Sequence, residues 1–355
     1  MPNKKGKTTP WPCGQCRKSC KTDCVSCTKC DVWYHAACET LSSKQMSALS
    51  DKSIYFVCSS CSGTVEGKFD VDAALKRLFS SAQKSPSEFY SAATSEEIAA
   101  RHLDMPSSDS DFMCGLPTDY TAMQILKLVR STQNRRAVCV PGDGNCLFSA
   151  VSVALTGHTE AANELRLRAA IELGINAAYH KRVMSQKRYD IVSQNYMGAC
   201  KSTAKNHAYS DAWTIQALAS AIGRNIRCIY PFVNGQFDET AAILNSTFFP
   251  KKQLYRQPIC IMWSSTVEPT DGKTWLPNHF VPMLDVVESV IDITLSPKHS
   301  PAEWPELSRQ NLCFNRRLKS KDFAGRCVML EMLLSNINVH VLHVTNNCYD
   351  VNNIV

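Results

Sequence analysis

The sequence lacks several features that would define a protein class directly. It has no apolar run near the roughly 20 residues that a membrane-spanning helix needs. The basic N-terminal stretch MPNKKGKTTPWPC lacks the apolar core of a secretory signal, and no internal repeat is visible. A net charge of +7 over 355 residues does not argue for a nucleic-acid partner. We therefore expect an intracellular protein of two or three domains that contacts neither membrane nor nucleic acid.

Cysteine, by contrast, is abundant and unevenly distributed. Nine of the 18 cysteines lie between Cys13 and Cys61, and the other nine are scattered from Cys114 to Cys348. A secreted disulfide scaffold would spread its pairs through the fold, whereas a dense block in an intracellular chain indicates metal binding. The two parts of the chain therefore use cysteine for different purposes.

The dense block contains eight potential metal ligands in four pairs, each pair separated by two residues. Such spacing lets one tight turn present two ligands to one tetrahedral zinc ion. A block this small cannot bury enough apolar surface to fold without metal. Free or redox-active cysteines would explain neither the order nor the spacing. We therefore expect two zinc ions, held by Cys13, Cys16, Cys27, Cys30, His35, Cys38, Cys58 and Cys61.

The ligand order, the stretch CDVWYHAAC, and Phe56 two residues before Cys58 together resemble the plant homeodomain (PHD) finger. A RING-type ubiquitin ligase module also holds cross-braced zinc, but the four-residue gap before His35 favours the PHD family. Cys20 and Cys24 fall outside the pattern and are expected to be loop residues. The resemblance implies interleaved ligands, with Cys13, Cys16, His35 and Cys38 on one zinc and Cys27, Cys30, Cys58 and Cys61 on the other.

PHD fingers commonly bind histone tails, and some enclose methyl-lysine in an aromatic cage, since a quaternary ammonium is attracted to ring faces. Trp33 matches a cage position, and Trp11 is a second candidate for peptide binding. The alternative is that Trp33 only packs the small core. The segment KTDCVS lacks the additional aromatic residues found in PHD fingers that bind methyl-lysine strongly. The resemblance implies a histone tail as a partner and the nucleus as the location.

The rest of the chain divides into three parts after the finger (residues 1–65). Residues 66–115 alternate helical patterns (VDAALKRLF, SEEIAARHL) with loop-like stretches (AQKSPSE, MPSSDSD), which predicts a partly helical linker. Residues 116–290 mix helical stretches (CLFSAVSVAL, ELRLRAAIELGINAAYHKR, WTIQALASAIG) with strand-like runs (NIRCIYP, PICIMW, HFVPML). This pattern predicts a mixed α/β (α+β) domain. The extension 291–355, with a helical stretch RCVMLEMLL and a strand-like NVHVLHV, suggests no role.

The stretch VCVPGDGNCLFSA places Cys146 between a glycine-containing turn and the start of a helix. A helix N-terminus stabilises negative charge, so we expect a thiolate accessible near neutral pH. The turn can also direct backbone N–H groups at a tetrahedral oxyanion. A nucleophilic thiol needs a base, and WLPNHFVPML offers His279 at the start of a predicted strand. Taken alone, the stretch around Cys146 fits a buried structural cysteine as well as a nucleophile. A lone histidine beside apolar residues is more often structural than catalytic.

Three stretches in order, PGDGNCLFSA, SDAWTIQALASAIGRNIRCIYP and NHFVPML, resemble the ovarian tumour (OTU) family of cysteine proteases, which are mostly deubiquitinases. The resemblance covers about residues 120–285. It implies that Cys146 is the nucleophile and His279 the general base. It also implies that Asp143 belongs to the oxyanion loop, which Gly144 and Asn145 continue.

One position departs from the family pattern. Many members place Asp or Asn two residues after the catalytic histidine to orient it, but this sequence has Val281 there. Asn278 and Asp271 are the possible substitutes, and without an orienting group the imidazole can take the wrong tautomer, at a cost of orders of magnitude in rate. We therefore expect a deubiquitinase that cleaves isopeptide bonds of ubiquitin or ubiquitin-like conjugates, with no cofactor in its catalytic domain. The alternative is a weak or inactive OTU-like scaffold that binds chromatin and ubiquitin, an architecture resembling proteins derived from mobile elements.

Overall fold

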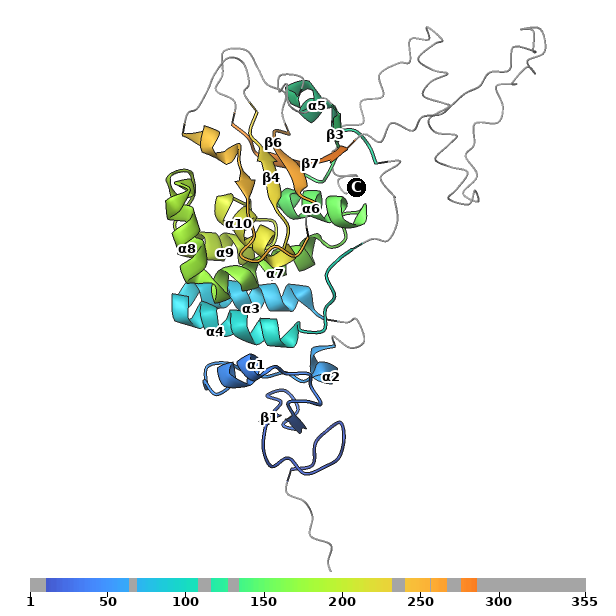
Figure 1. The fold of residues 1–355 in the computed structure, drawn as a ribbon, viewed down its shortest axis with the longest axis vertical. Coiled ribbons are helices and arrows are strands. Elements are labelled where there is room, and N and C mark those ends of the chain that lie inside the picture. Colours follow the sequence, from blue (N-terminus) through green and yellow to red (C-terminus); the bar gives the residue numbers. More distant parts are fainter. Residues whose placement is uncertain are drawn as a thin grey trace, which may run out of the picture.

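The computed structural model describes residues 11–63, 69–107, 116–126, 134–231, 240–255, 257–266 and 276–285. The C-terminal extension 291–355 lies outside these residues, and so do its expected helix and strand. Figure 1 shows a cysteine-rich module at one end, a central layer of helices, and a β-sheet at the other end. Within the described ranges, no helix is long and apolar enough to cross a membrane.

The cysteine-rich module, residues 11–63, contains little regular structure. Its two strands pair antiparallel, with Val25 opposite Tyr34. Its small core consists largely of cysteines and a few apolar side chains, of which Phe56 is the most buried. Such a core is too small to hold the module together unaided, which fits the expected dependence on metal. The elements are β1 (Cys24–Ser26), β2 (Trp33–His35), α1 (Ser43–Ala48) and α2 (Ser59–Ser62).

Residues 69–107 form two adjacent helices, α3 (Val71–Lys84) and α4 (Pro86–Ala99). Only Ser85 separates them, because its hydroxyl accepts a hydrogen bond from the Glu88 N–H and Pro86 is suited to a first helical position. The break predicted at AQKSPSE as a loop or hinge is therefore present, but it is a single residue and not a longer loop. The stretch SEEIAARHL is the end of α4 and not, as expected, the start of a helix.

These two helices are packed into the main hydrophobic core. Leu78 and Phe89 are fully buried there together with residues of the central helices. Helix α3 contacts α7 (Ala162–Ile175) and α9 (Tyr196–Ala204), and α4 contacts α7. The segment expected as a linker therefore forms a helical layer packed against the central domain. The domain boundaries proposed from the sequence stay a prediction.

The helices predicted for the central domain are present, with one break. Helices α6 and α10 end at Gly157 and Gly223, whose φ angles of 80° and 64° are left-handed, as expected for C-terminal caps. The stretch ELRLRAAIELGINAAYHKR is divided at Asn176 into α7 and a second helix. The remaining elements are α5 (Tyr120–Leu126), α6 (Cys146–Thr156), α8 (Ala177–Gln186), α10 (Ala212–Ile222), and the 3₁₀ turns η2 (Tyr189–Val192) and η3 (Ala241–Leu244).

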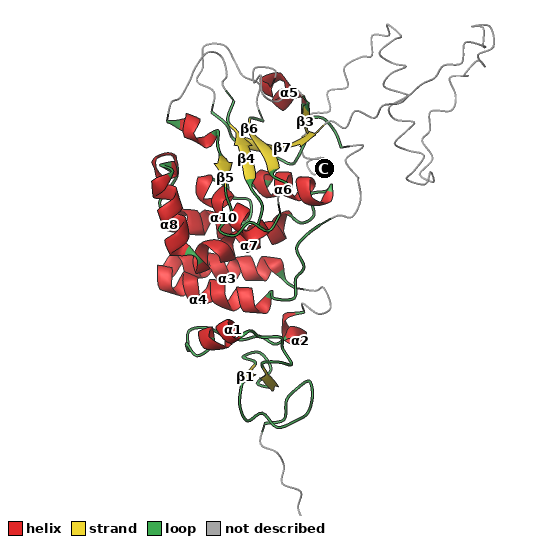
Figure 2. Ribbon diagram, viewed as in Figure 1, coloured by secondary structure: helices red, strands yellow, loops and turns green. Residues whose placement is uncertain are grey.

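A five-stranded mixed sheet has the order β3-β7-β6-β4-β5. Only β4 and β6 run parallel; the other neighbours are antiparallel. Helices α6 and α10 pack on one face with Phe280, while α5 covers the other face with Val281 (Figure 2). The mixed α/β class and its three predicted strands are therefore confirmed. The strands are β3 (Arg135–Ala137), β4 (Ile226–Ile229), β5 (Thr247–Phe248), β6 (Ile259–Ser264) and β7 (His279–Asp285).

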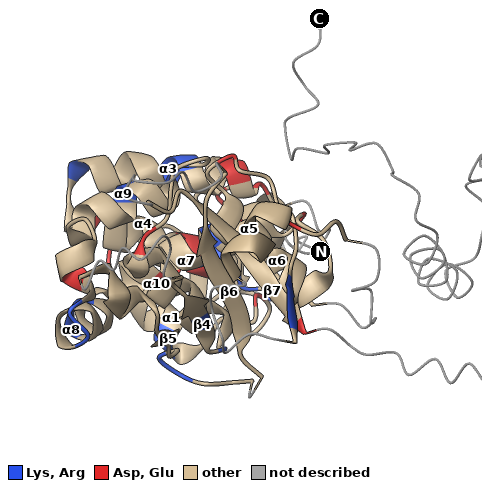
Figure 3. Ribbon diagram, turned by 90° about the horizontal axis from the view of Figure 1, so that it is seen from above, with Lys and Arg blue, Asp and Glu red and all other residues tan. Residues whose placement is uncertain are grey.

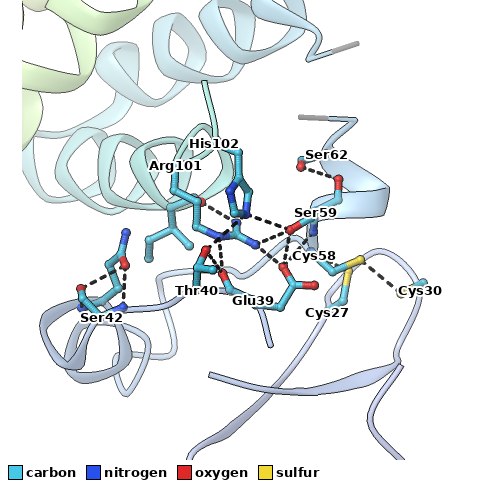
Figure 4. A network of polar contacts seen from close by, with 12 residues as sticks. Cys27, Cys30, Glu39, Thr40, Ser42, Cys58, Ser59, Ser62, Arg101 and His102 are labelled. Atoms are coloured by element: carbon cyan, nitrogen blue, oxygen red, sulfur yellow. Dashed lines mark hydrogen bonds and ion pairs between the residues drawn. The ribbon is translucent and has the colours of Figure 1, made fainter. Parts of the chain in front are cut away.

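The cysteine-rich module is docked on the end of α4 by buried polar contacts (Figure 4). Arg101 forms an ion pair with Glu39, and both side chains are 5% exposed. The same Glu39 carboxylate accepts hydrogen bonds from the N–H and the hydroxyl of Ser59. The hydroxyl of Tyr55 donates to Glu96 of α4. The module is therefore anchored to the helical layer through groups on both sides of the contact.

Candidate active site and metal centre

Cys146 is the first residue of α6 and is only 2% exposed. Burial raises the pKa of its thiol to about 11, although the backbone N–H groups of Phe280 and Leu147 favour the thiolate. The negative charge of Asp143 raises the pKa further. The expectation of a thiolate near neutral pH is therefore wrong for the free protein, because desolvation outweighs the stabilisation at the helix N-terminus.

His279 is the first residue of β7 and is 3% exposed. Burial lowers its pKa, against the charges of Asp119 and Asp143, so its imidazole is neutral at neutral pH and able to accept a proton. Its Nδ1 atom is buried and has no hydrogen-bond partner in the described part of the chain. The backbone N–H of Phe280, the next residue, hydrogen-bonds the sulfur of Cys146 and favours its thiolate. The structure thus brings Cys146 close to β7, the strand that begins with His279.

The predicted oxyanion loop precedes α6 and is tightly held. Gly144 has a φ of +85°, and a Cβ atom there would lie 2.1 Å from the carbonyl oxygen of His207, so only glycine fits. The N–H of Asn145 donates to Asp143 Oδ1 at 2.9 Å. Asp143 also faces His207, whose Nδ1 lies 3.3 Å from Asp143 Oδ2. Asp143, Gly144 and Asn145 therefore form one turn beside the thiol.

The residue expected to orient His279 does not do so in the structure. The Asn278 side chain accepts a hydrogen bond from the Thr266 N–H at 2.9 Å, and its amide donates to Thr266 Oγ1 at 3.1 Å. Its oxygen is thus engaged across the ends of β6 and β7 and not by the imidazole. The other candidate, Asp271, lies outside the described residues. The imidazole therefore lacks the predicted Asn278 contact.

Arg166 is a site residue that the sequence reading missed. Its side chain is fully buried in α7, and its guanidinium donates to Asn145 Oδ1 and to the Gly144 carbonyl, both at 2.8 Å. It also donates to the carbonyl groups of Ser202, Thr203, Lys205 and Ala208. Burial lowers its pKa to about 10. The stretch ELRLRAA gave no signal for it, because Arg166 stands there among other charged residues, Glu164 and Arg168.

The eight predicted metal ligands lie in the two predicted groups. Cys13, Cys16, His35 and Cys38 place their donor atoms within 4.8 Å of one another, and so do Cys27, Cys30, Cys58 and Cys61. The interleaved arrangement is therefore present in the geometry of the chain.

The donor atoms also suit zinc. With Zn–S bonds of about 2.3 Å, two thiolates on one tetrahedral ion lie roughly 3.8 Å apart, and the sulfur atoms of Cys30 and Cys58 are 3.9 Å apart. His35 Nε2 lies 3.1 Å from the carbonyl oxygen of Ser19, while Nδ1 lies 3.4 Å from Cys16 Sγ. Because the second nitrogen of a metal-bound histidine normally donates to an oxygen, this geometry fits a ligand that binds through Nδ1. When bound, zinc would cross-link the strands of the module.

Two further predictions concern residues of the same module. Cys20 and Cys24 lie with His35 in a third group whose donor atoms are within 4.8 Å, although Cys24 belongs to β1 and not to a loop. The rings of Trp11 and Trp33 lie 5.8 Å apart at 41°, and Trp11 is 59% exposed. The two tryptophans predicted to bind a peptide therefore lie side by side at the surface.

Solved structures similar to the chain include OTU domains. The structure of the OTUD1 OTU domain has a TM-score of 0.29 at 16% identity, and covers 46% of this chain and 99% of that one. The viral OTU domain protease from Dera Ghazi Khan virus has a TM-score of 0.28 at 15% identity, and covers 42% of this chain and 80% of that one.

Curated relatives similar to the chain are vertnins. The Mus musculus protein is 26% identical over 187 residues, 46% of this chain and 25% of its own length. The Homo sapiens protein is 24% identical over 220 residues, 51% of this chain and 31% of its own length. The chain therefore spans only about a quarter to a third of the length of these relatives.

The family model of the vertnin OTU domain matches residues 137–203 and 185–264. This segment runs from β3 to the end of β6 and includes Cys146, whereas His279 lies beyond it. Residues 137–264 are therefore the part of the chain that is similar to the vertnin OTU domain.

Proposed function

We propose that this protein is a cysteine-dependent deubiquitinase that cleaves isopeptide bonds of ubiquitin or a ubiquitin-like protein. The observation that carries the proposal is the position of the Cys146 thiol. It lies at the N-terminus of α6, beside the backbone N–H of Phe280, the residue that follows His279 in β7. A nucleophile, a neutral base and a turn of backbone N–H groups together are the components of acyl transfer.

In the proposed reaction, the Cys146 thiol gives its proton to the neutral imidazole of His279 as the sulfur attacks the carbonyl carbon of the terminal glycine of ubiquitin. Backbone N–H groups of the turn that contains Gly144 stabilise the oxyanion. The imidazolium then protonates the lysine amine, which leaves as the C–N bond breaks. Water, deprotonated by His279, hydrolyses the thioester and regenerates the thiol.

The N-terminal module has a separate proposed role as a PHD-type finger with two zinc ions. The exposed Trp11, with the ring of Trp33 tilted beside it, is a suitable surface for a histone tail and for the ammonium group of methyl-lysine. This role would place the protein in the nucleus. Basic and acidic residues are interspersed over the described helices and strands (Figure 3), which supports a protein partner over nucleic acid.

A second candidate function is a ubiquitin- and chromatin-binding scaffold with weak or no catalysis. Two observations favour it: burial raises the pKa of Cys146 to about 11, and the buried Nδ1 of His279 has no partner among the residues described. A protonated thiol and an unoriented base both slow acyl transfer. The two candidates differ in turnover and not in ubiquitin affinity.

Hydrolysis of ubiquitin that carries a C-terminal fluorophore tests the proposal. We expect turnover by the full chain, and its loss by a factor of at least about 10³ in Cys146→Ala and in His279→Ala. Cys200→Ala is the matched control, since this thiol is also fully buried in a helix but belongs to α9. Ubiquitin binding with no turnover by the wild-type chain would favour the scaffold.

A further inference from the structure

Among the residues that the structure describes, Nδ1 of the proposed general base His279 has no hydrogen-bond partner. Val281, at the position where an acid would be expected, is buried against α5, and Asn278 is engaged by Thr266. The charges of Asp119 and Asp143 act on His279, but neither carboxylate is hydrogen-bonded to its Nδ1 in the structure; they accept the N–H groups of Ala122 and Asn145. An orienting group must therefore be sought among the other side chains near His279.

Ser264 is the last residue of β6 and lies directly opposite His279 in the antiparallel β6–β7 pair. Directly opposed residues of an antiparallel sheet place their side chains on the same face, with Cβ atoms about 5 Å apart. Ser264 is fully buried, and its Oγ has no hydrogen-bond partner in the part of the chain that the structure describes. The same is true of His279 Nδ1.

Two unsatisfied polar side chains on one cross-strand pair are unusual. Nearly all buried polar atoms in native proteins have a partner, because burial without one costs the full desolvation of the group. The two atoms are not hydrogen-bonded to each other in the structure. Rotation about the serine χ1 angle moves the hydroxyl between staggered positions, and one buried water can bridge two such groups. Ser264 Oγ and His279 Nδ1 can therefore be hydrogen-bond partners, directly or through a water.

We propose that Ser264 is a positioning residue for His279, in the place that an acid would otherwise occupy. Its hydroxyl accepts the imidazole N–H that is turned away from Cys146, so that the other nitrogen is left to take the thiol proton. This inference rests on the proposed function. A neutral hydroxyl fixes the tautomer and the ring plane, but it does not add the negative charge with which a carboxylate would stabilise the imidazolium.

Kinetics of three variants test the inference in an active protein. Ser264→Ala should lower kcat for the ubiquitin substrate about tenfold, with KM unchanged. Ser264→Thr keeps the hydroxyl and should retain most of the activity. Ser193→Ala removes another buried hydroxyl without a partner, between η2 and α9, and should leave kcat unchanged. Equal kcat for Ser264→Ala and wild type would overturn the inference while leaving the proposed function intact.

The tautomer of His279 provides a readout that does not need turnover. Nitrogen NMR on the full chain, assigned with a His279→Gln variant, should show one neutral tautomer in the wild type and in Ser264→Thr. Ser264→Ala should show a mixture. An unchanged single tautomer in Ser264→Ala would overturn the inference whether or not the protein hydrolyses ubiquitin. Absence of turnover in the wild type would instead count against the proposed function alone.

Discussion

The Cys146 thiol is subject to two opposing influences. The N-terminus of α6 and the N–H of Phe280 stabilise the thiolate, whereas burial and the charge of Asp143 stabilise the thiol. Burial is the larger effect and raises the pKa to about 11. The neutral imidazole of His279, whose pKa is lowered by burial, therefore meets a protonated thiol in the free protein. A proton must pass between them during the attack.

This balance predicts a steep pH dependence of thiol reactivity. Because only the thiolate reacts and the pKa lies near 11, its fraction rises about tenfold per pH unit below that value. The rate of alkylation of Cys146 by iodoacetamide, followed by mass spectrometry of the peptide, should therefore keep rising from pH 7 to pH 10. A plateau below pH 8 would show instead that the thiol is ionised in the free protein by pairing with His279.

At the scale of elements, α7 holds the oxyanion loop in place. Arg166 connects the turn before α6, through Gly144 and Asn145, with the carbonyl groups at the end of α9 and after it. Its ring contact with Phe148, 4.4 Å from the guanidinium to the ring centroid, fixes it against α6 as well. One buried cation therefore joins three segments at the candidate site.

Loss of this cation should be costly. Arg166→Met keeps much of the apolar volume but leaves the carbonyl groups of the loop without donors, so we expect a loss of about 3 kcal/mol or more in the free energy of unfolding. Urea denaturation monitored by tryptophan fluorescence measures it. Arg182→Met, at an exposed position of α8, should change stability by no more than about 0.5 kcal/mol. Equal stability of the two variants would contradict the assigned role of Arg166.

The elements of the central domain could be read from the sequence where local signals were strong. Glycine caps ended α6 and α10, and short apolar runs gave β4, β6 and β7. The paired spacing predicted the eight ligands, because two-residue gaps constrain the chain locally, whereas their interleaved division into two groups came from the resemblance to PHD fingers. By contrast, the contacts of Arg166 and of Asn278 depend on segments distant in sequence, and the pKa of Cys146 depends on burial. No local pattern carries that information. The sequence therefore predicted the metal ligands and named Cys146 and His279, but it predicted neither the contacts of Arg166 and Asn278 nor the raised pKa of Cys146.

For the whole molecule, the cysteine-rich module and the helical layer form one connected structure. Cys58 directly precedes α2, whose Ser59 binds the Glu39 carboxylate, and Glu39 pairs with Arg101 beyond α4. His102 adds a further contact, 3.1 Å from Ser59 Oγ (Figure 4). The second ligand group therefore lies directly behind the docking contact, whereas Cys16 of the first group is exposed.

This arrangement predicts unequal effects of the two metal groups. The full chain should bind two zinc ions, and both Cys58→Ser and Cys16→Ser should reduce the number to one. Only Cys58→Ser should also speed amide hydrogen exchange at the end of α4, because it loosens the turn that holds Glu39. Native mass spectrometry and hydrogen exchange measure the two effects. Equal protection of α4 in both variants would contradict the coupling, and three bound zinc ions would contradict the interleaved assignment.

The central claim, that Cys146 is a nucleophile directed at the C-terminus of ubiquitin, is tested most directly by a ubiquitin probe with a C-terminal electrophile. We predict a single covalent adduct, mapped by mass spectrometry to Cys146, slowed in His279→Ala and absent in Cys146→Ala. Cys200→Ala should be labelled like the wild type. Labelling that persists in Cys146→Ala, or that maps to another cysteine, would contradict the account.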